Sequence, residues 1–297
     1  MSVTQPFDSW VQSVQVEIEK VLSTLLPSAD DIPQRLHQAM RYAVLDGGKR
    51  IRPLLVFAAG NLFDADRRML ERAAAAVEMI HAYSLIHDDM PCMDDDVLRR
   101  GKPTVHVQFD EATALLAGDA LQAQAFMALS GQEGAADRTL AMVRLLAHAS
   151  GSAGMCGGQA IDLASVGFSL SREQLETMHQ LKTGALLRAS IMLGALCGKL
   201  LSQEEETALD AYAKAVGLAF QVVDDVLDAT ADSATLGKTA GKDAADHKPT
   251  YVSILGLEQS KSLAEKLRQD AHAAIAPFGE KAHYLRELAD LVVHRNK

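Results

Sequence analysis

The sequence sets an apolar run, AAAAVEMIHAYSLI (Ala73–Ile86), directly before a group of carboxylates, HDDMPCMDDD (His87–Asp96). The run is apolar on most sides of a helix, which predicts a helix at the centre of a helical core. Aspartate occupies five of the next positions: 88, 89, 94, 95 and 96. Because the chain already carries a net charge of −10, this crowding calls for a chemical reason.

The rest of the chain also predicts helices. Aromatic residues make up only 5 % and hydrophobic residues 48 %, a balance that favours helix when alanine and leucine are plentiful. Helical periodicity covers residues 7–26, 33–48, 54–63, 69–90, 111–130, 138–151, 171–198 and 202–230, and two C-terminal helices follow. No convincing alternating strand and no Pro- or Ser-rich linker separates them. We therefore expect one all-α domain over residues 1–297, built as a single large helical bundle.

Composition narrows the function classes. A pI near 5.4 argues against nucleic acid or an anionic membrane as a bulk partner. The three cysteines, Cys92, Cys156 and Cys197, have neither metal-type spacing nor an even count, so a reducing cytoplasm is the expected compartment. The first residues do not resemble a signal peptide, and Arg188 interrupts the most apolar helical segment. We therefore expect no membrane span.

A second acidic group, QVVDDVLD, contains Asp224, Asp225 and Asp228. Asp224 and Asp228 are four residues apart, so a helix places them about 40° apart on one face. Carboxylates that follow an apolar helix must be paired, hydrated or bound to metal. Oxygen-only ligands suit Mg²⁺ or Mn²⁺ rather than zinc.

The first acidic group is less regular, because Pro91 disturbs the helix between its two halves. Spacing alone leaves open whether Asp94 or Asp95 joins Asp88. On a helix, His81 and Ser84 share the face of Asp88.

Basic residues accompany both acidic groups. They occur in GGKRIRP, in LRRGKP, in HQLKTGALLR and in the segment after the second acidic group: Lys49, Arg50, Arg52, Arg99, Arg100, Lys182, Lys238, Lys242 and Lys248. Carboxylates that hold Mg²⁺ beside Arg and Lys that hold oxyanions describe a site for a diphosphate or triphosphate. The chain has no GxxxxGK[ST] segment and no GxGxxG after a strand, so nucleotide binding by those routes is not expected.

Six segments occur in an order that closely resembles bacterial short-chain trans-prenyl diphosphate synthases: GGKRIRP, SLIHDDMPCMDDDVLRRGKPTVH, GMCGGQAIDL, HQLKTGAL, GLAFQVVDDVLD and TLGKTAGKD…HKPTY. The resemblance spans about residues 30 to 297 and is strongest to farnesyl diphosphate synthases. It implies the isoprenoid synthase type of bundle with a central active-site cavity. It also implies a Mg²⁺-dependent, head-to-tail condensation of isopentenyl diphosphate with dimethylallyl or geranyl diphosphate, which gives the C15 product farnesyl diphosphate.

The resemblance also implies residue roles. Mg²⁺, with three ions in the family when substrate is bound, or alternatively Mn²⁺, would be held by Asp88, Asp89, Asp94, Asp224 and Asp228. Isopentenyl diphosphate would be held by Lys49, Arg52, His81 and Arg100. The allylic diphosphate would be held by Arg99, Lys182, Lys238 and Lys248. Thr183 and Gln221 would lie beside the developing cation, while Asp95 and Asp96 would contact basic residues.

Tyr83, with Ser84 beside it, stands where the family has a bulky residue on the floor of the chain pocket, which favours a C15 product. The nearest alternative is a geranylgeranyl or geranyl diphosphate synthase with the same mechanism. A class I terpene cyclase would not need GGKRIRP and Arg100, and a non-catalytic partner subunit usually lacks one aspartate motif. The family implies a homodimer that binds small diphosphates and has no nucleic acid partner.

Overall fold

The computed structural model describes residues 5–131, 136–168, 170–230 and 250–295. The chain divides into two compact units. The first contains Met1–Leu145 with Leu193–Leu200, and the second contains Leu146–Met192 with Leu201–Lys297. Helices α7 (Ala136–Ser150) and α10 (Ala185–Gly198) each have residues in both units. The single domain predicted for residues 1–297 stays a prediction.

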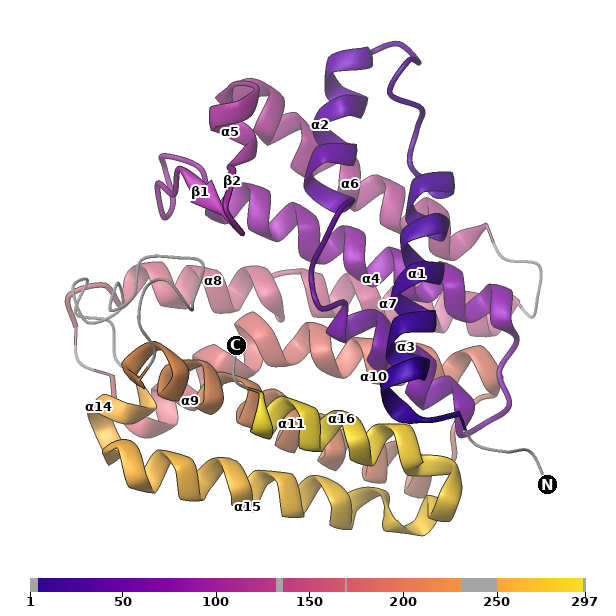
Figure 1. The fold of residues 1–297 in the computed structure, drawn as a ribbon, viewed down its shortest axis with the longest axis vertical. Helices are drawn as coiled ribbons and strands as arrows, with labels where there is room; N and C mark the ends of the chain where they lie inside the picture. The colour runs from indigo at the N-terminus through magenta and orange to yellow at the C-terminus, as the bar shows by residue number, and fades with distance from the viewer. Residues whose placement is uncertain (1–4, 132–135, 169, 231–249, 296–297) are drawn as a thin grey trace. The chain divides into compact units, whose positions relative to one another are not determined.

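The first unit consists of helices and one short hairpin (Figure 1). Its elements, besides parts of α7 and α10, are α1 (Phe7–Leu25), α2 (Gln34–Val44), α3 (Ile51–Asn61), α4 (Arg67–Asp88), β1 (Leu98–Arg99), β2 (Lys102–Pro103), α5 (Val105–Gln108) and α6 (Glu111–Ser130). Helices α4 and α6 pack side by side. The central position predicted for the apolar run is confirmed, because all residues from Ala73 to Ile80 are buried.

The second unit is also helical. Its further elements are α8 (Met155–Ala164), α9 (Arg172–His179), the π-helix η1 (Gln180–Gly184), α11 (Gln203–Thr230), α14 (Tyr251–Leu255), α15 (Leu257–Ile275), the 3₁₀-helix η2 (Ala276–Ala282) and α16 (His283–His294). Helix α15 packs against both α11 and α16. Tyr212 of α11 is fully buried and donates a hydrogen bond to the carbonyl oxygen of Leu285 at 2.6 Å.

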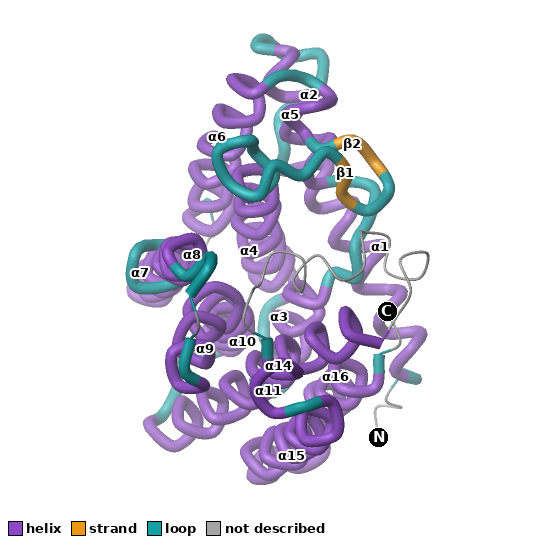
Figure 2. Tube along the Cα trace, turned by 90° about the vertical axis from the view of Figure 1, so that its left-hand side faces the viewer, coloured by secondary structure: helices purple, strands orange, loops and turns teal. Residues whose placement is uncertain are grey.

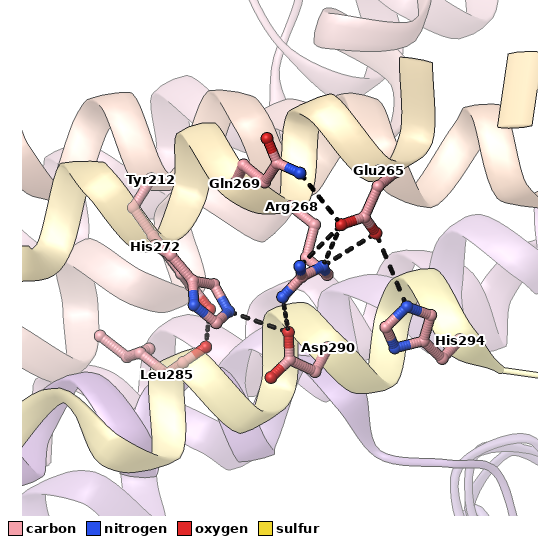
Figure 3. A network of polar contacts seen from close by, with 8 residues as sticks. All are labelled: Tyr212, Glu265, Arg268, Gln269, His272, Leu285, Asp290 and His294. Carbon is pink, nitrogen blue, oxygen red and sulfur yellow. Dashed lines mark hydrogen bonds and ion pairs between the residues drawn. The ribbon is translucent and has the colours of Figure 1, made fainter. Parts of the chain in front are cut away.

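Helices α15 and α16 are joined by polar contacts that the sequence did not reveal (Figure 3). Arg268 pairs with Glu265 on its own helix and with Asp290 on α16, both at 2.7 Å. His272 also contacts Asp290, at 2.9 Å. The hydrogen bonds from Arg268 lower the pKa of Glu265 to about 2. These charges fix the pairing of two amphipathic helices whose apolar faces form the adjacent core.

The all-α class is confirmed, and most of the predicted helices agree with the observed ones. The short helix α5 was missed, and so were two further local features. The first is the β1–β2 hairpin, the one strand pair in the described part of the chain (Figure 2). The second is α8, whose Gly157 and Gly158 lower helix propensity. In both cases tertiary contacts outweigh weak local preference.

One described helical stretch, Arg172–Gly198, is long and apolar enough by composition to cross a membrane. It combines α9, η1 and α10, and 56 % of its most apolar window is buried in the protein. A buried core helix has the same composition, so this stretch is weak support for a membrane span.

Candidate functional site

The carboxylates after α4 are gathered by a backbone turn. The amide of Asp94 donates to the carbonyl oxygen of Asp88 at 2.9 Å, and the amide of Asp96 donates to that of Asp89 at 3.2 Å. The chain therefore folds back on the end of the helix and brings Asp94 beside Asp88, although six positions separate them. Asp95 is exposed and adopts a left-handed backbone conformation with φ of 50°. Local geometry thus favours Asp94 over Asp95 as the companion of Asp88.

Asp89 and Arg99 form a close ion pair that ties the hairpin to α4. Both carboxylate oxygens of Asp89 accept hydrogen bonds from Arg99, at 2.6 to 2.8 Å. The side chain of Asp89 is only 3 % exposed. Burial by itself lowers the pKa of Arg99, but the hydrogen bonds and charge of Asp89 raise it overall. The protein thus holds Arg99 beside Asp88 as a fixed cation.

The hairpin also fixes Arg100. A two-residue turn, Arg100–Gly101, joins β1 to β2, and both residues have positive φ (52° and 76°). Such a turn matches the twist of paired strands, but the first position is strained for a residue with a Cβ. The guanidinium of Arg100 lies against Gly48, where an added Cβ would meet its Nη1 at 2.8 Å. Gly48, with φ of 95°, therefore gives Arg100 its place.

The GGKRIRP segment separates into residues with different environments. Arg50 is buried and pairs with Glu78 at 2.6 Å and with Glu19 at 2.7 Å. It is a structural cation that anchors the segment between Lys49 and Arg52. Burial by itself lowers the pKa of Arg50, but the charges and hydrogen bonds of Glu78 and Glu19 raise it overall.

His81 on α4 is close to several arginines. Burial, followed by the positive charges of Arg52 and Arg100, holds the pKa of His81 well below its ordinary value. His81 is therefore neutral near pH 7 and keeps one N–H donor. Because arginines surround it, His81 is placed to contact an anion, and its neutral ring adds no charge of its own.

In the second unit, the π-helix η1 carries Lys182 and Thr183. Helix α8 packs against it so closely that a Cβ on Gly158 would overlap the backbone of Lys182. The amine of Lys182 pairs with Asp162 of α8 at 2.5 Å. A π-helical turn shifts side chains relative to an α-helix and is frequent at functional sites.

The neighbouring His179 is mostly enclosed and stacks on the ring of Tyr251, with ring centroids 5.7 Å apart. Burial lowers the pKa of His179 to about 4. Neither ring nitrogen has a hydrogen-bond partner among the described residues, and the same holds for the side-chain amide of Gln159. No sequence pattern singled out a role for His179.

The second acidic group lies at the C-terminal part of α11 with Gln221, one turn before Asp225. Asp224 pairs with Arg295 at 2.7 Å and is 48 % exposed. Asp225 is buried and accepts a hydrogen bond from the amide of Tyr251 at 2.6 Å. The two adjacent aspartates therefore face different surroundings, as their 100° separation on a helix requires.

Sequence reasoning missed the anchoring roles of Glu78, Asp225 and Arg295. The position of Asp225, next to Asp224 on an apolar helix, was a signal that it points inward. No sequence pattern pointed to Arg295. Lys238 and Lys248, predicted to hold the allylic diphosphate, lie outside the described residues, as does Lys242.

Tyr83 and Ser84 lie on different sides of α4. Ser84 lies about 40° from Asp88 around α4, whereas Tyr83 lies about 140° away. The ring of Tyr83 is buried and meets the ring of His87 edge to face, with centroids 5.7 Å apart. The role of Tyr83 in product length stays a prediction.

The donors present fit a hard divalent cation. The turn brings the backbone of Asp94 beside that of Asp88, and Asp224 and Asp228 share one face of α11. Oxygen donors of this kind suit Mg²⁺ or Mn²⁺. Within the described residues, no three His, Cys, Asp or Glu side chains already form a single cluster.

The polyprenyl synthetase family model matches residues 33–280. A protein of Bradyrhizobium diazoefficiens named probable farnesyl diphosphate synthase is 51 % identical over 282 residues, which cover 94 % of this chain and 85 % of that protein. The farnesyl diphosphate synthase of Escherichia coli is 50 % identical over 266 residues, which cover 88 % of this chain and 89 % of that enzyme.

A solved structure gives the same result for the fold. The apo crystal structure of an FPP/GFPP synthase from Zymomonas mobilis has a TM-score of 0.86 and 44 % sequence identity. The match covers 97 % of this chain and 98 % of that one. The predicted isoprenoid synthase type of bundle is therefore confirmed, whereas its central active-site cavity stays a prediction.

Proposed function

Because the chain belongs to the polyprenyl synthetase family and is a prenyltransferase, we propose that it makes farnesyl diphosphate. The substrates are isopentenyl diphosphate and either dimethylallyl or geranyl diphosphate. The observation that carries the proposal is the turn and hairpin after α4, which gather Asp88, Asp94, Arg99 and Arg100 at one place in the chain. Relatives about 50 % identical with the name farnesyl diphosphate synthase support the C15 product.

The proposed mechanism begins with substrate binding. Arg99, Lys182, Lys238 and Lys248 hold the allylic diphosphate. The isopentenyl diphosphate is held by Lys49, Arg52, His81 and Arg100. Since His81 is neutral, it donates a hydrogen bond to a diphosphate oxygen and leaves the charge balance to the arginines.

Asp88, Asp94, Asp224 and Asp228 would hold Mg²⁺, with Asp89 contributing through its pair with Arg99. When bound, Mg²⁺ neutralises charge on a leaving diphosphate. The remaining catalysis is electrostatic, because fixed cations such as Arg99 and Lys182 favour the charge that develops as the allylic C–O bond breaks. Arg99 needs little reorganisation, since Asp89 already holds it.

The carbon–carbon bond then forms. The double bond of isopentenyl diphosphate attacks the allylic cation, and the departed diphosphate accepts the proton that is lost. The hydroxyl of Thr183 and the amide oxygen of Gln221 stabilise the cation by their dipoles without capturing it. The product is five carbons longer than the allylic substrate.

We also propose a cytoplasmic homodimer. In support, large apolar side chains on α6 are exposed in the single chain: Leu115 is 47 %, Leu116 55 % and Met127 64 % exposed. A second copy could cover such a surface. The three free cysteines are consistent with a reducing compartment.

The test is a product assay. The purified protein is incubated with Mg²⁺, isopentenyl diphosphate and, separately, dimethylallyl or geranyl diphosphate, and the alcohols are identified after phosphatase treatment. We expect farnesol as the main product. A C20 alcohol would keep the mechanism but refute the C15 assignment, and release of diphosphate without elongation would refute the synthase.

A further inference from the structure

A cavity of about 200 Å³ lies in the first unit between α4, the α2–α3 loop and the β1–β2 hairpin. Its apolar wall includes Leu45, Ala82, Leu85, Ile86 and Val105. No role in substrate binding was assigned to any of these side chains. The volume is below the usual 300 to 1,000 Å³ of pockets for drug-sized ligands, so the cavity fits one or two rings or a short branched chain.

This cavity faces a different side of α4 from the proposed substrate site. The residues that line it from this part of the chain are Ala82, Leu85 and Ile86 of α4 and Asp89 directly after the helix. They are centred roughly 120° around the helix from His81, Ser84 and Asp88.

Of the four residues expected to hold isopentenyl diphosphate, one lines the cavity and three do not. Arg100 lines the cavity, whereas Lys49, Arg52 and His81 do not. The cavity therefore adjoins the diphosphate site and shares Arg100 with it.

The rim of the cavity carries positive charge. Arg100 and Lys102 line it, and neither side chain makes a hydrogen bond or ion pair within the described part of the chain. Arg99 also lines it, but Asp89 already balances its charge. With Asp46 on the same rim, the remaining balance is one positive charge, which complements a monoanion.

We propose that this cavity binds a small carboxylate with a compact aromatic or branched aliphatic group. The apolar wall receives the hydrocarbon part, and Arg100 and Lys102 contact the carboxylate. The ligand engages Arg100, which is expected to hold isopentenyl diphosphate, so its binding raises the KM for isopentenyl diphosphate. This kinetic coupling rests on the proposed function, whereas the binding itself does not.

The experiment uses 1-naphthoate as the probe and 1-naphthalenemethanol as its neutral counterpart, with calorimetric titration of the full chain. Lys102→Glu reverses an exposed rim charge, and Ala82→Leu fills the apolar wall. Lys20→Glu is the matched charge-reversal control, on α1 and away from the cavity. Lys49→Ala tests the alternative that the probe occupies the diphosphate site.

We expect Lys102→Glu to weaken naphthoate binding roughly ten-fold, since reversal both removes an attraction and adds a repulsion. The neutral alcohol should bind more weakly than naphthoate to the wild type and be insensitive to Lys102→Glu. Ala82→Leu should abolish binding of both probes. Lys20→Glu and Lys49→Ala should leave naphthoate binding unchanged.

Equal affinity of naphthoate for the wild type and Lys102→Glu would overturn the proposal. Loss of binding in Lys49→Ala, with retention in Ala82→Leu, would place the anion in the diphosphate site instead. If naphthoate binds as expected but the KM for isopentenyl diphosphate does not change, the coupling is refuted while the site stands.

Discussion

The buried pair of Arg50 and Glu78 offers a test of how the GGKRIRP segment is held. The two side chains are 4 % and 5 % exposed and 2.6 Å apart. Glu19 of α1 supports the same guanidinium at 2.7 Å and also accepts from the amide of Asp46 at 2.6 Å. We therefore expect Glu78→Gln to weaken both the fold and the isopentenyl diphosphate site.

The magnitude follows from the burial. Removal of one partner of a buried ion pair costs about 3 to 5 kcal/mol. The amide of Gln can still accept a hydrogen bond and Glu19 keeps its charge, so the loss should be near the lower limit, about 3 kcal/mol. At about 2 °C per kcal/mol for a chain of this size, the Tm should fall by about 6 °C.

The assay combines thermal unfolding with steady-state kinetics. Glu258→Gln is the control, because Glu258 pairs with Lys261 at the surface and is 85 % exposed; its Tm should change by less than about 1 °C. In Glu78→Gln the KM for isopentenyl diphosphate should rise, since Lys49 adjoins Arg50, while the KM for the allylic substrate stays constant. A Tm within about 1 °C of wild type, or equal changes in both KM values, would refute the reasoning.

Three further predictions follow from single side chains. Tyr83→Ala removes a buried ring one to two turns before Asp88 and should lengthen the product towards C20; product length unchanged by chromatography would exclude Tyr83 as the floor. His179 has a folded pKa of about 4 against an ordinary 6.5, so its contribution to stability is present above pH 6.5 and is lost as the pH falls towards 4. The drop in Tm between pH 7.5 and 5 should therefore be smaller in His179→Gln, and equal drops would contradict this. Asp225→Asn weakens the acceptor for the Tyr251 amide and should lower the Tm by about 2 to 4 °C, for a loss of about 1 to 2 kcal/mol; the same Tm as wild type would count against that anchor.

The sequence by itself determined the all-α class, the positions of most helices and the family. These properties depend on the period of apolar residues and on motifs that are contiguous in the chain, such as the run before Asp88 and the GGKRIRP segment. A helix with apolar residues on most sides must be buried wherever it lies. The burial of Ala73 to Ile80 could therefore be predicted without a structure.

Only the three-dimensional structure decided the surroundings of each member of a charged group. Spacing could not choose between Asp94 and Asp95, because Pro91 ends the helical register and a backbone hydrogen bond to Asp88 sets the position instead. Likewise, Arg50 differs from its neighbours only because Glu78, 28 positions away, lies against it. The pairing of Asp225 with Tyr251 has the same origin. The contacts of Arg50 and Asp225 join residues far apart in the chain, and their energy depends on burial and distance, neither of which a linear pattern contains.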